Sequence, residues 1–312
     1  MSGGFFLGVD GGGTKTEFQC IDAAGEVLAR HIGGVCYHLQ VGVDGVRDVL
    51  AQGIGAVCAA LGISPAQLTQ SFFGLPAFGE DAAVDPHLDA VVGELLGHDR
   101  FRCGNDMICG WAGSLAGQDG INLVAGTGSI GYGERRGRSA RCGGWGEVFS
   151  DEGSAYWIAI QGLNAFTRMS DGRLPPGPLL DLFRTTLALR DDIDICATTM
   201  GTPPLGRDGI AALAKLVQAA ADDDDQAAIT IHDRAADELM SMAQALRTAL
   251  RYDPGERTLI SWSGGAVKAG SGVATALRHR LDASGDFDPI EPLHSPAYGA
   301  ALYARGLAAT PA

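Results

Sequence analysis

The feature that most constrains the fold is a short loop of small residues between two strand patterns, and this arrangement occurs twice. In the first copy, the apolar run Phe5–Asp10 leads through a glycine cluster into the alternating segment Thr16–Asp22. In the second, the apolar run Ile121–Ala125 leads through Gly126–Ser129 into Ile130–Glu134. Each copy is typical of a β-hairpin. The repeated order predicts two related halves of the molecule.

The length and the remaining pattern predict a two-domain α/β protein. A chain of 312 residues is too long for one compact core. The other predicted strands are Val27–Ile32, Phe72–Leu75, Phe101–Cys103 and Thr258–Trp262. The predicted helices are Val43–Leu61, Val84–Leu96, one from about Asp106, one that ends near Leu281 and one from Pro296. Residues 153–252 are expected to be mostly helical, with a break at Pro175–Pro178.

The net charge of the chain argues against two classes of binding partner. A formal net charge of −14 repels phosphate backbones and anionic lipid, so we expect neither nucleic acid nor a membrane as partner. Met1–Phe6 lacks a basic segment followed by an apolar one, so we expect no signal peptide. The most apolar run, Ile54–Ile63, is too short to span a membrane and is interrupted by glycine.

The cysteines favour a reducing compartment. Their number is odd and no CxxC pair occurs, which gives no support to a disulfide framework or an iron–sulfur site. The seven are Cys20, Cys36, Cys58, Cys103, Cys109, Cys142 and Cys196. We therefore expect buried thiols and a cytoplasmic location.

The first glycine loop has the chemistry of a phosphate-binding loop. Its residues are Gly11, Gly12, Gly13, Thr14 and Lys15. Thr14 separates Gly13 from Lys15, which excludes a P-loop, and the strand that follows excludes a dinucleotide-binding loop. Glycine amides, a hydroxyl and an ammonium group still suit phosphate, and Asp10 could hold Mg²⁺ through water. The alternative is a plain glycine-rich hairpin with an aspartate in its turn.

Two further loops and one acidic residue follow predicted strands. The second loop contains Thr127, Gly128 and Ser129, and the third contains Gly264 and Gly265 between a strand and a helix. Either could be an ordinary turn, but three such loops reinforce one another. Asn105-Asp106 opens a helix. Asp106 is therefore either a helix cap or a general base for an attacking hydroxyl.

The most unusual stretch combines glycines, aromatic rings and two carboxylates. It runs from Cys142 to Trp157 and includes Trp145, Asp151 and Glu152. Aromatic rings pack on sugar faces and carboxylates accept hydrogen bonds from sugar hydroxyls. The structural alternative places Trp145 and Trp157 in the core and makes Asp151 a helix cap. A run of four aspartates, Asp222–Asp225, is expected to be a solvated loop.

The chain as a whole resembles the N-acetylglucosamine kinases and the BadF/BadG/BcrA/BcrD ATPases of the actin/hexokinase superfamily. The resemblance covers nearly the whole length. It rests on GVDGGGTKT at Gly8–Thr16, ND at Asn105–Asp106, AGTGS at Ala125–Ser129, CGGWG with SDEGSAYW within Cys142–Trp157, and SGGA at Ser263–Ala266. The glycine loops are shared across the superfamily, whereas the Cys142–Trp157 stretch is more specific.

The resemblance implies a fold of two ribonuclease H-like (actin-like ATPase) domains around a nucleotide and substrate cleft. Residues 1–114, joined by a returning helix at 294–312, would form the first domain. Residues 115–293 would form the second, with a helical insertion.

The same resemblance implies roles for the motif residues. Asp10 would help to hold Mg²⁺, and the first two loops would bind the phosphates of ATP. Gly264 and Gly265 would flank the adenosine. Asp106 would be the base.

The expected sugar-binding residues are Tyr37, Asn105, Gly144, Trp145 and Asp151. Mammalian relatives place Asn-His-Trp after the third strand, where this chain has Cys36–Leu39, and a serine of the family is replaced by Ala77. Glucosamine and N-acetylglucosamine therefore both stay open as acceptors.

The function expected from these residues is transfer of the γ-phosphate of ATP to a hydroxyl of an amino sugar, by resemblance the 6-hydroxyl. One alternative is a BadF-type ATPase that activates a partner enzyme. Another is a non-catalytic sensor of nucleotide or sugar. The oligomeric state stays open, with a homodimer as one possibility.

Overall fold

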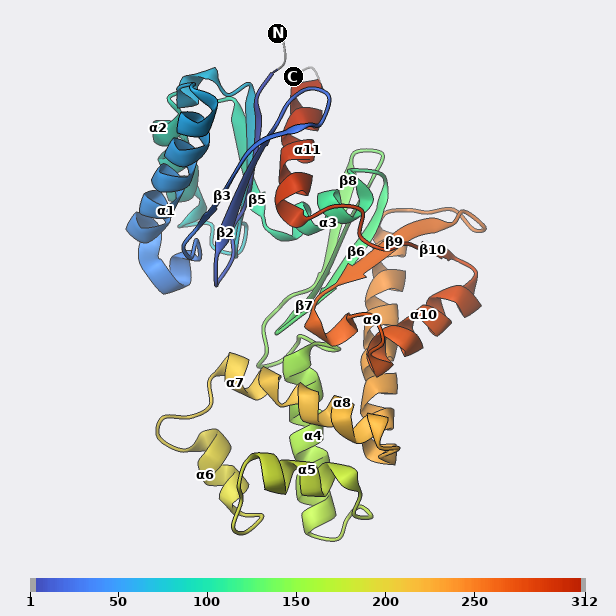
Figure 1. The fold of residues 1–312 in the computed structure, drawn as a ribbon. Helices are drawn as coiled ribbons and strands as arrows, with labels where there is room; N and C mark the ends of the chain where they lie inside the picture. Colours follow the sequence, from blue (N-terminus) through green and yellow to red (C-terminus); the bar gives the residue numbers. More distant parts are fainter. Residues whose placement is uncertain (1–3, 310–312) are drawn as a thin grey trace. The chain divides into compact units, whose positions relative to one another are not determined.

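The computed structural model describes residues 4–309, which form two compact units. The N-terminal unit contains residues up to Asp119 and those from Glu291 onward, and the C-terminal unit is Gly120–Ile290. Both units combine a five-stranded sheet with helices, so the chain has the α/β class expected (Figure 1). Among the helices of residues 4–309, none is long and apolar enough to cross a membrane.

The N-terminal unit has a mixed sheet in the order β3-β2-β1-β4-β5. Its strands are β1 (Phe6–Asp10), β2 (Thr16–Ile21), β3 (Val27–Gly33), β4 (Gln70–Leu75) and β5 (Phe101–Asn105). Its helices are α1 (His38–Leu61), the 3-10 turn η1 (Pro65–Gln67), α2 (Asp85–Leu96), α3 (Met107–Leu115) and α11 (Pro296–Ala309). In Figure 1, α1 and α2 lie on one face of this sheet and α11 on the other.

The C-terminal unit has a second mixed sheet in the order β10-β9-β6-β7-β8. Its strands are β6 (Gly120–Ala125), β7 (Ser129–Arg135), β8 (Arg138–Gly143), β9 (Thr258–Ser263) and β10 (Phe287–Pro289). Between β8 and β9 the chain forms α4 (Ala155–Ser170), α5 (Pro178–Thr186), α6 (Asp194–Met200), α7 (Arg207–Ala212), α8 (Ala214–Asp222) and α9 (Gln226–Ala249). The 3-10 turn η2 (Gly265–Val267) and α10 (Gly272–Ser284) follow β9.

The two sheets share one topology, which confirms the predicted duplication. In each, the first strand pairs antiparallel with the second, and the second antiparallel with the third. On its other side the first strand pairs parallel with the fourth. The prediction omitted β8 and β10. Strand β8 runs directly into the glycine-rich stretch that follows it, and β10 has only three residues.

Two helix starts differ from the prediction. α1 begins at His38 rather than Val43, but Gly42 interrupts it with a φ of 70°. The helix expected directly after the third glycine loop begins only at Gly272. Gly270 turns the chain with a φ of 83°, and the Ser271 hydroxyl then accepts a hydrogen bond from the Ala274 amide.

Helix α11 belongs to the N-terminal unit, although it follows the whole C-terminal unit in the sequence. Its backbone lies so close to β1 that a Cβ on Gly8 would come within 2.0 Å of the Ala301 amide. It also meets α3, where a Cβ on Gly299 would come within 2.1 Å of the Gly113 amide. Glycines at these crossings therefore allow direct backbone packing.

Candidate active site

Two acidic residues lie at one edge of the N-terminal sheet. The parallel strands β1, β4 and β5 are in a register that sets Asp10 beside Gly74, and Leu75 beside Asn105. Asp10 is the last residue of β1, and Asp106 directly follows β5. Because the carboxyl ends of parallel strands meet at one edge, the fold brings these two predicted acids together.

The surroundings of Asp10 disfavour its charged form. Burial, with the nearby carboxylate of Asp106 as the next cause, raises the pKa of Asp10 to about 8. The fully buried thiol of Cys109 lies in the same place and donates a hydrogen bond of 3.6 Å to the carbonyl of Val9, the residue before Asp10. Gly74 keeps this space open, since a Cβ there would lie 2.2 Å from Cys109 Sγ. A cation bound at this edge would relieve the repulsion between the two acids.

Asp106 stands at the start of α3 without capping it. The structure shows no capping hydrogen bond from its side chain to the helix. The Asn105 side chain takes that place, because its Oδ1 accepts a hydrogen bond of 3.2 Å from the Met107 amide. Asn105 Nδ2 donates to the carbonyl of Phe78 at 3.3 Å. The capping alternative for Asp106 is therefore wrong, and both polar atoms of Asn105 have backbone partners.

The first glycine loop is tied to the same sheet edge. The Gly11 amide donates to the Gly74 carbonyl at 2.8 Å, next to the register position of Asp10. The Gly12 carbonyl accepts a hydrogen bond of 3.2 Å from the Cys36 amide, which joins the loop to the segment before α1. The base of the loop is thus fixed by backbone contacts.

The far end of this loop faces solvent. Gly13, Thr14 and Lys15 are all exposed, and the Lys15 ammonium pairs with Glu17. Tyr37 lies beside the loop, since a Cβ on Gly13 would be 3.9 Å from Tyr37 Cδ1. The predicted phosphate loop and one predicted sugar-binding residue are therefore neighbours.

The second loop, Gly126–Ser129, is held by the start of α4. The carbonyls of Gly126 and Thr127 accept hydrogen bonds of 2.9 and 3.2 Å from the first two amides of that helix. The Ser129 hydroxyl donates to the Glu152 carbonyl at 2.7 Å. This loop is therefore tied to the glycine- and aromatic-rich stretch that comes before α4.

The third loop lies against the second. β6 and β9 run parallel, with Val124 opposite Ser263, so the two loops leave the same sheet edge. Gly264 has a φ of 110°, and a Cβ there would lie 2.4 Å from the Ala125 carbonyl oxygen. A Cβ on Gly265, by contrast, would meet no atom within 4 Å. The pair thus combines one position that requires glycine with one that leaves the backbone accessible.

Asp151 is buried beside the second loop. The helix-cap alternative is wrong for this residue, since Ser154 is the N-cap of α4 and its hydroxyl accepts from the Trp157 amide at 3.1 Å. Asp151 is 2% exposed and has a φ of 59°, an uncommon conformation for a residue other than glycine. A Cβ on Gly128 would lie 2.6 Å from Asp151 Oδ2. The predicted sugar-binding carboxylate therefore contacts a predicted phosphate loop.

Trp145 is a surface residue, which overturns its core alternative. It is 70% exposed, and the Arg141 guanidinium lies 5.6 Å from the centre of its ring. The turn that carries it out of β8 uses Gly143 and Gly144, with φ values of 73° and 72°. Trp157, in contrast, packs against the core of the C-terminal unit as expected. Trp145 therefore leaves a large apolar surface available for a ligand.

Two charged residues at this site carry no sequence signal of their own. Arg207, the first residue of α7, pairs with Asp151 at 2.6 Å and with Glu147 at 3.1 Å. Its neighbour Asp208 accepts a hydrogen bond of 3.2 Å from the Thr127 hydroxyl. Both come from the helical insertion, far from any glycine motif, so only the fold brings them to the site.

The donor set suits a magnesium ion held with a nucleotide. Within residues 4–309, no three His, Cys, Asp or Glu side chains gather into a metal-binding cluster. Mg²⁺ commonly takes only one or two carboxylates and completes its shell with water and phosphate oxygens. Asp10 fits this role, because burial first and the Asp106 carboxylate second disfavour its charged form, and a bound cation would favour that form.

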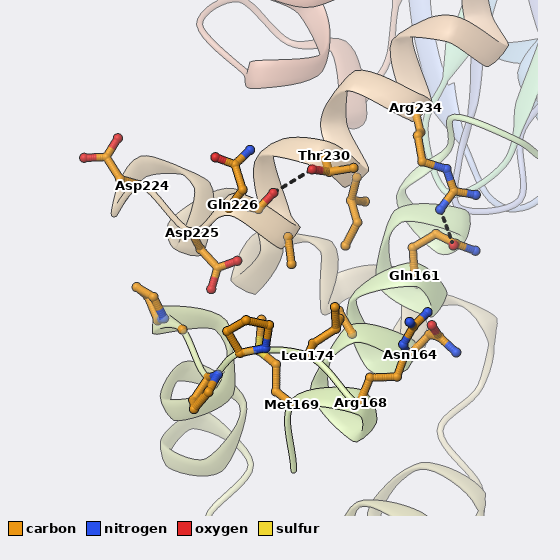
Figure 2. Close-up of a pocket in the computed structure, with 17 residues that line it drawn as sticks. Gln161, Asn164, Arg168, Met169, Leu174, Asp224, Asp225, Gln226, Thr230 and Arg234 are labelled. Carbon is orange, nitrogen blue, oxygen red and sulfur yellow. Dashed lines mark hydrogen bonds between the residues drawn. The ribbon is translucent and has the colours of Figure 1, made fainter. Parts of the chain in front are cut away.

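A cavity in the helical insertion shares no residue with these loops. Its volume is about 550 Å³, and it lies between α4, the segment from Leu174 to Pro178 and the start of α9 (Figure 2). On one side of it, Arg234 donates a hydrogen bond of 3.2 Å to the Gln161 side chain, which is the dashed line between these two residues in Figure 2. Asp225, at its edge, is 2% exposed, so the expected solvated loop of aspartates is wrong at this position.

Two known proteins are similar to this chain over most of its length. An N-acetyl-D-glucosamine kinase of Dictyostelium discoideum is 27% identical and covers 97% of this chain and 98% of its own. An N-acetylmuramic acid/N-acetylglucosamine kinase of Clostridium acetobutylicum is also 27% identical, over 84% and 85% of the two chains.

A solved structure shares the fold. It is a protein of Chromobacterium violaceum, provisionally assigned as an N-acetylglucosamine kinase, with 23% identity and a TM-score of 0.73 over 96% of this chain and 98% of that one. A ROK family glucokinase of Streptomyces griseus, solved with glucose and AMPPNP, has 17% identity and a TM-score of 0.57 over 96% and 98%. Both show that the fold of this chain also occurs in those two proteins.

The family assignment rests on the whole chain rather than on single loops. The sequence pattern of the BadF/BadG/BcrA/BcrD ATPases matches residues 7–304, which include every loop and both acids of the candidate site. The duplicated sheets and the shared fold agree with that match. The chain belongs to the BadF/BadG/BcrA/BcrD ATPase family.

Proposed function

We propose that this protein is a magnesium-dependent kinase that transfers the γ-phosphate of ATP to a hydroxyl of an amino sugar. Membership of an ATPase family supports the use of ATP. The curated relatives from Dictyostelium and Clostridium, which match over most of this chain, support a sugar as acceptor. Seven free thiols fit a reducing compartment, and we propose that the enzyme works in the cytoplasm.

The observation that carries this proposal is the pairing of Asp10 and Asp106 at one sheet edge. A plain glycine hairpin does not need a second acid near Asp10. The Asp106 side chain also makes no capping hydrogen bond to α3. Two carboxylates in one place support two separate roles, one toward a metal and one toward a hydroxyl proton. Gly11–Lys15 begins at the same edge, so phosphate can be bound beside them.

Each part of the proposed site has a chemical role. Asp106 accepts the proton of the attacking hydroxyl, which increases its nucleophilicity as the bond to phosphorus forms. The amides and hydroxyls of the first two loops bind phosphate oxygens and hold the γ-phosphate in line with the acceptor. When bound beside Asp10, Mg²⁺ would neutralise phosphate charge. The loop at Gly264 and Gly265 is proposed to bind the adenosine.

The sugar is proposed to bind at Trp145 and Asp151, with Tyr37, Asn105 and Gly144 as further contacts. An exposed indole can cover one face of a sugar ring, and a buried carboxylate can accept hydrogen bonds from its hydroxyls. We propose the 6-hydroxyl as the acceptor group, because it is a primary alcohol at the end of the ring. Glucosamine and N-acetylglucosamine are both candidate substrates.

The test is ADP release measured against a panel of sugars. Purified protein with ATP and Mg²⁺ is assayed with glucosamine, N-acetylglucosamine, N-acetylmuramic acid and glucose, with and without chelator. We expect at least one amino sugar to be phosphorylated and the activity to vanish in chelator. If ATP is hydrolysed while no sugar is phosphorylated, the kinase proposal fails and an ATPase that activates a partner enzyme gains support.

Substitution of Asp106 tests its role as the base. Asp106→Asn keeps the shape and removes the proton acceptor, so kcat should fall by about 10²- to 10⁴-fold with sugar affinity largely kept. Steady-state kinetics with a direct sugar-binding measurement provide the readout. Asp48→Asn, an exposed change on α1, is the matched control and should stay at wild-type activity. Full activity of Asp106→Asn would remove Asp106 from the mechanism.

A further inference from the structure

The helical insertion sends one charged side chain into the proposed sugar site. Helix α7 begins with Arg207, which lies in the sequence well after the second glycine loop and the stretch that carries Asp151. The segment before it is fixed by a backbone hydrogen bond of 3.0 Å from Leu205 to the Thr199 carbonyl. The start of α7 is therefore attached to the insertion and reaches the site from there.

Three groups meet at this point. Arg207 Nη2 lies 2.6 Å from Asp151 Oδ2, and Arg207 Nε lies 3.1 Å from Glu147 Oε2. A Cβ on Gly128 would approach Arg207 Nη2 to 2.4 Å and Asp151 Oδ2 to 2.6 Å. The ion pair thus lies directly against the backbone of the second loop. The adjacent contact between Asp208 and Thr127, at 3.2 Å, joins the same helix to that loop.

The ion pair has the properties of a positioning device. The Asp151 side chain is only 3% exposed, and a carboxylate so buried needs a partner to remain in place. The rigid fork of a guanidinium can hold two carboxylates at once and fix their orientation. Arg207 engages Oδ2 of Asp151, which leaves Oδ1 to accept a hydrogen bond from a sugar hydroxyl.

We propose that Arg207 is the positioning residue for Asp151, and that the helical insertion thereby completes the amino-sugar site of the C-terminal unit. This inference rests on the proposed kinase function. Its physical content is that removal of the guanidinium leaves the buried Asp151 carboxylate without its cation. The carboxylate then turns away or is displaced, and sugar binding weakens while the phosphate loop keeps its backbone contacts to α4.

The experiment compares Arg207→Gln and Arg207→Lys with wild type and with Arg190→Gln. Arg190 is a suitable control because it belongs to the same insertion, is 93% exposed and pairs with Asp194. Kinetic constants are measured separately for the sugar and for ATP, and thermal unfolding checks that each variant is folded. Loss of a charged partner at a buried carboxylate predicts about a 10- to 100-fold rise in KM for the sugar in Arg207→Gln.

Several outcomes distinguish a positioning role from a general structural one. We expect KM for ATP to change less than about threefold, and Arg207→Lys to recover part of the sugar affinity, since it restores the charge without the fork. Arg190→Gln should match wild type. An equal rise in both KM values, or a Tm collapse shared by Arg207→Gln and Arg207→Lys, would show that Arg207 only supports the fold.

The assay also separates this inference from the proposed function. If wild type phosphorylates a sugar and Arg207→Gln does so with unchanged constants, the inference about Arg207 is wrong and the kinase proposal stands. If wild type phosphorylates none of the sugars, the kinase proposal fails first and the role given to Arg207 fails with it.

Discussion

At the scale of single residues, several acidic groups of the candidate site lower the stability of the folded protein. Burial is the main cost of charging Asp10, and repulsion by Asp106 adds to it. Asp151 adopts a left-handed backbone conformation, and it is held by an arginine from a distant helix. Such arrangements persist where binding or catalysis requires them, because elsewhere a neutral residue would be more stable.

The substitution Asp10→Asn tests whether the charge of Asp10 destabilises the folded protein. The folded chain keeps the Asp10 proton up to a pKa of about 8, whereas an unfolded chain releases it near 3.8. Between these values the unfolded state binds fewer protons, so stability falls as the pH rises. In chelator at pH 8.5, Asp10→Asn should therefore melt higher than wild type, on the order of 5 °C, and the gap should narrow at pH 5. Calorimetry at the two pH values measures it.

The same variant should lose its magnesium-dependent activity at any metal concentration. Asp48→Asn, on the surface of α1, controls for the change in net charge and should melt like wild type. Identical melting of Asp10→Asn and wild type at both pH values would contradict the burial of an uncompensated charge.

Some site residues could be predicted from sequence and others could not. Asp10 ends one strand and Asp106 directly follows another, and parallel strands end at one edge, so their proximity follows from the pattern alone. Arg207 belongs to a helical region whose packing depends on contacts between distant segments, and no local motif marks it. The fold was also needed to exclude a core position for Trp145 and a helix cap for Asp151, since the sequence left both alternatives open.

At the scale of elements, one buried carboxylate joins the starts of two helices. Asp225 Oδ2 accepts a hydrogen bond of 2.9 Å from Leu179, in the first turn of α5. Asp225 Oδ1 accepts one of 3.0 Å from Ala228, in the first turn of α9. Both helix N-termini carry partial positive charge and unsatisfied amides, so one side chain stabilises both.

Removal of this shared cap should be costly. Asp225→Ala is expected to lower the free energy of unfolding by about 1–3 kcal/mol, since one cap is worth about 0.5–2 kcal/mol and two are lost. Asp223→Ala, in the same run but exposed, should have little effect. Denaturant melts of the two variants give the comparison, and equal stabilities would mean that the shared cap contributes nothing.

The sequence predicted most elements because their periodicity is strong. It missed β10, which has three residues, and it treated Asp225 as one more solvated aspartate. A short strand has too few positions to show alternation, and it forms here because β9 lies beside it. The burial of Asp225 likewise depends on α5, which the local charge pattern does not reveal.

At the scale of the whole molecule, the cysteines divide between the units. The five thiols of the N-terminal unit are buried, and burial raises the pKa of both Cys20 and Cys36 to about 12. In the C-terminal unit, Cys196 is exposed and Cys142 is partly buried. The expectation of buried thiols thus holds in the first unit and is wrong for Cys196.

Thiol labelling should therefore report on the N-terminal unit by itself. In native protein, Cys196 should react within minutes and Cys142 more slowly, because the thiolate is the reactive form and burial suppresses it. The five buried thiols should react only after denaturant unfolds their unit. A Cys196→Ser variant should lose the fast phase and nothing else, and native-state labelling of the five would mean that their unit opens readily.

Because α11 packs on β1 and α3, the N-terminal unit cannot be completed when its own strands are first synthesised. The sheet β1–β5 leaves the ribosome before the C-terminal unit, and α11 begins about 190 residues after β5 ends. At about 5–20 residues per second, the apolar face of that sheet stays without its covering helix for roughly 10–40 s. During this interval the nascent chain exposes Gly8, Gly113 and their neighbours to solvent. Until α11 is made, we therefore expect the nascent chain to carry the kind of uncovered apolar surface that chaperones bind.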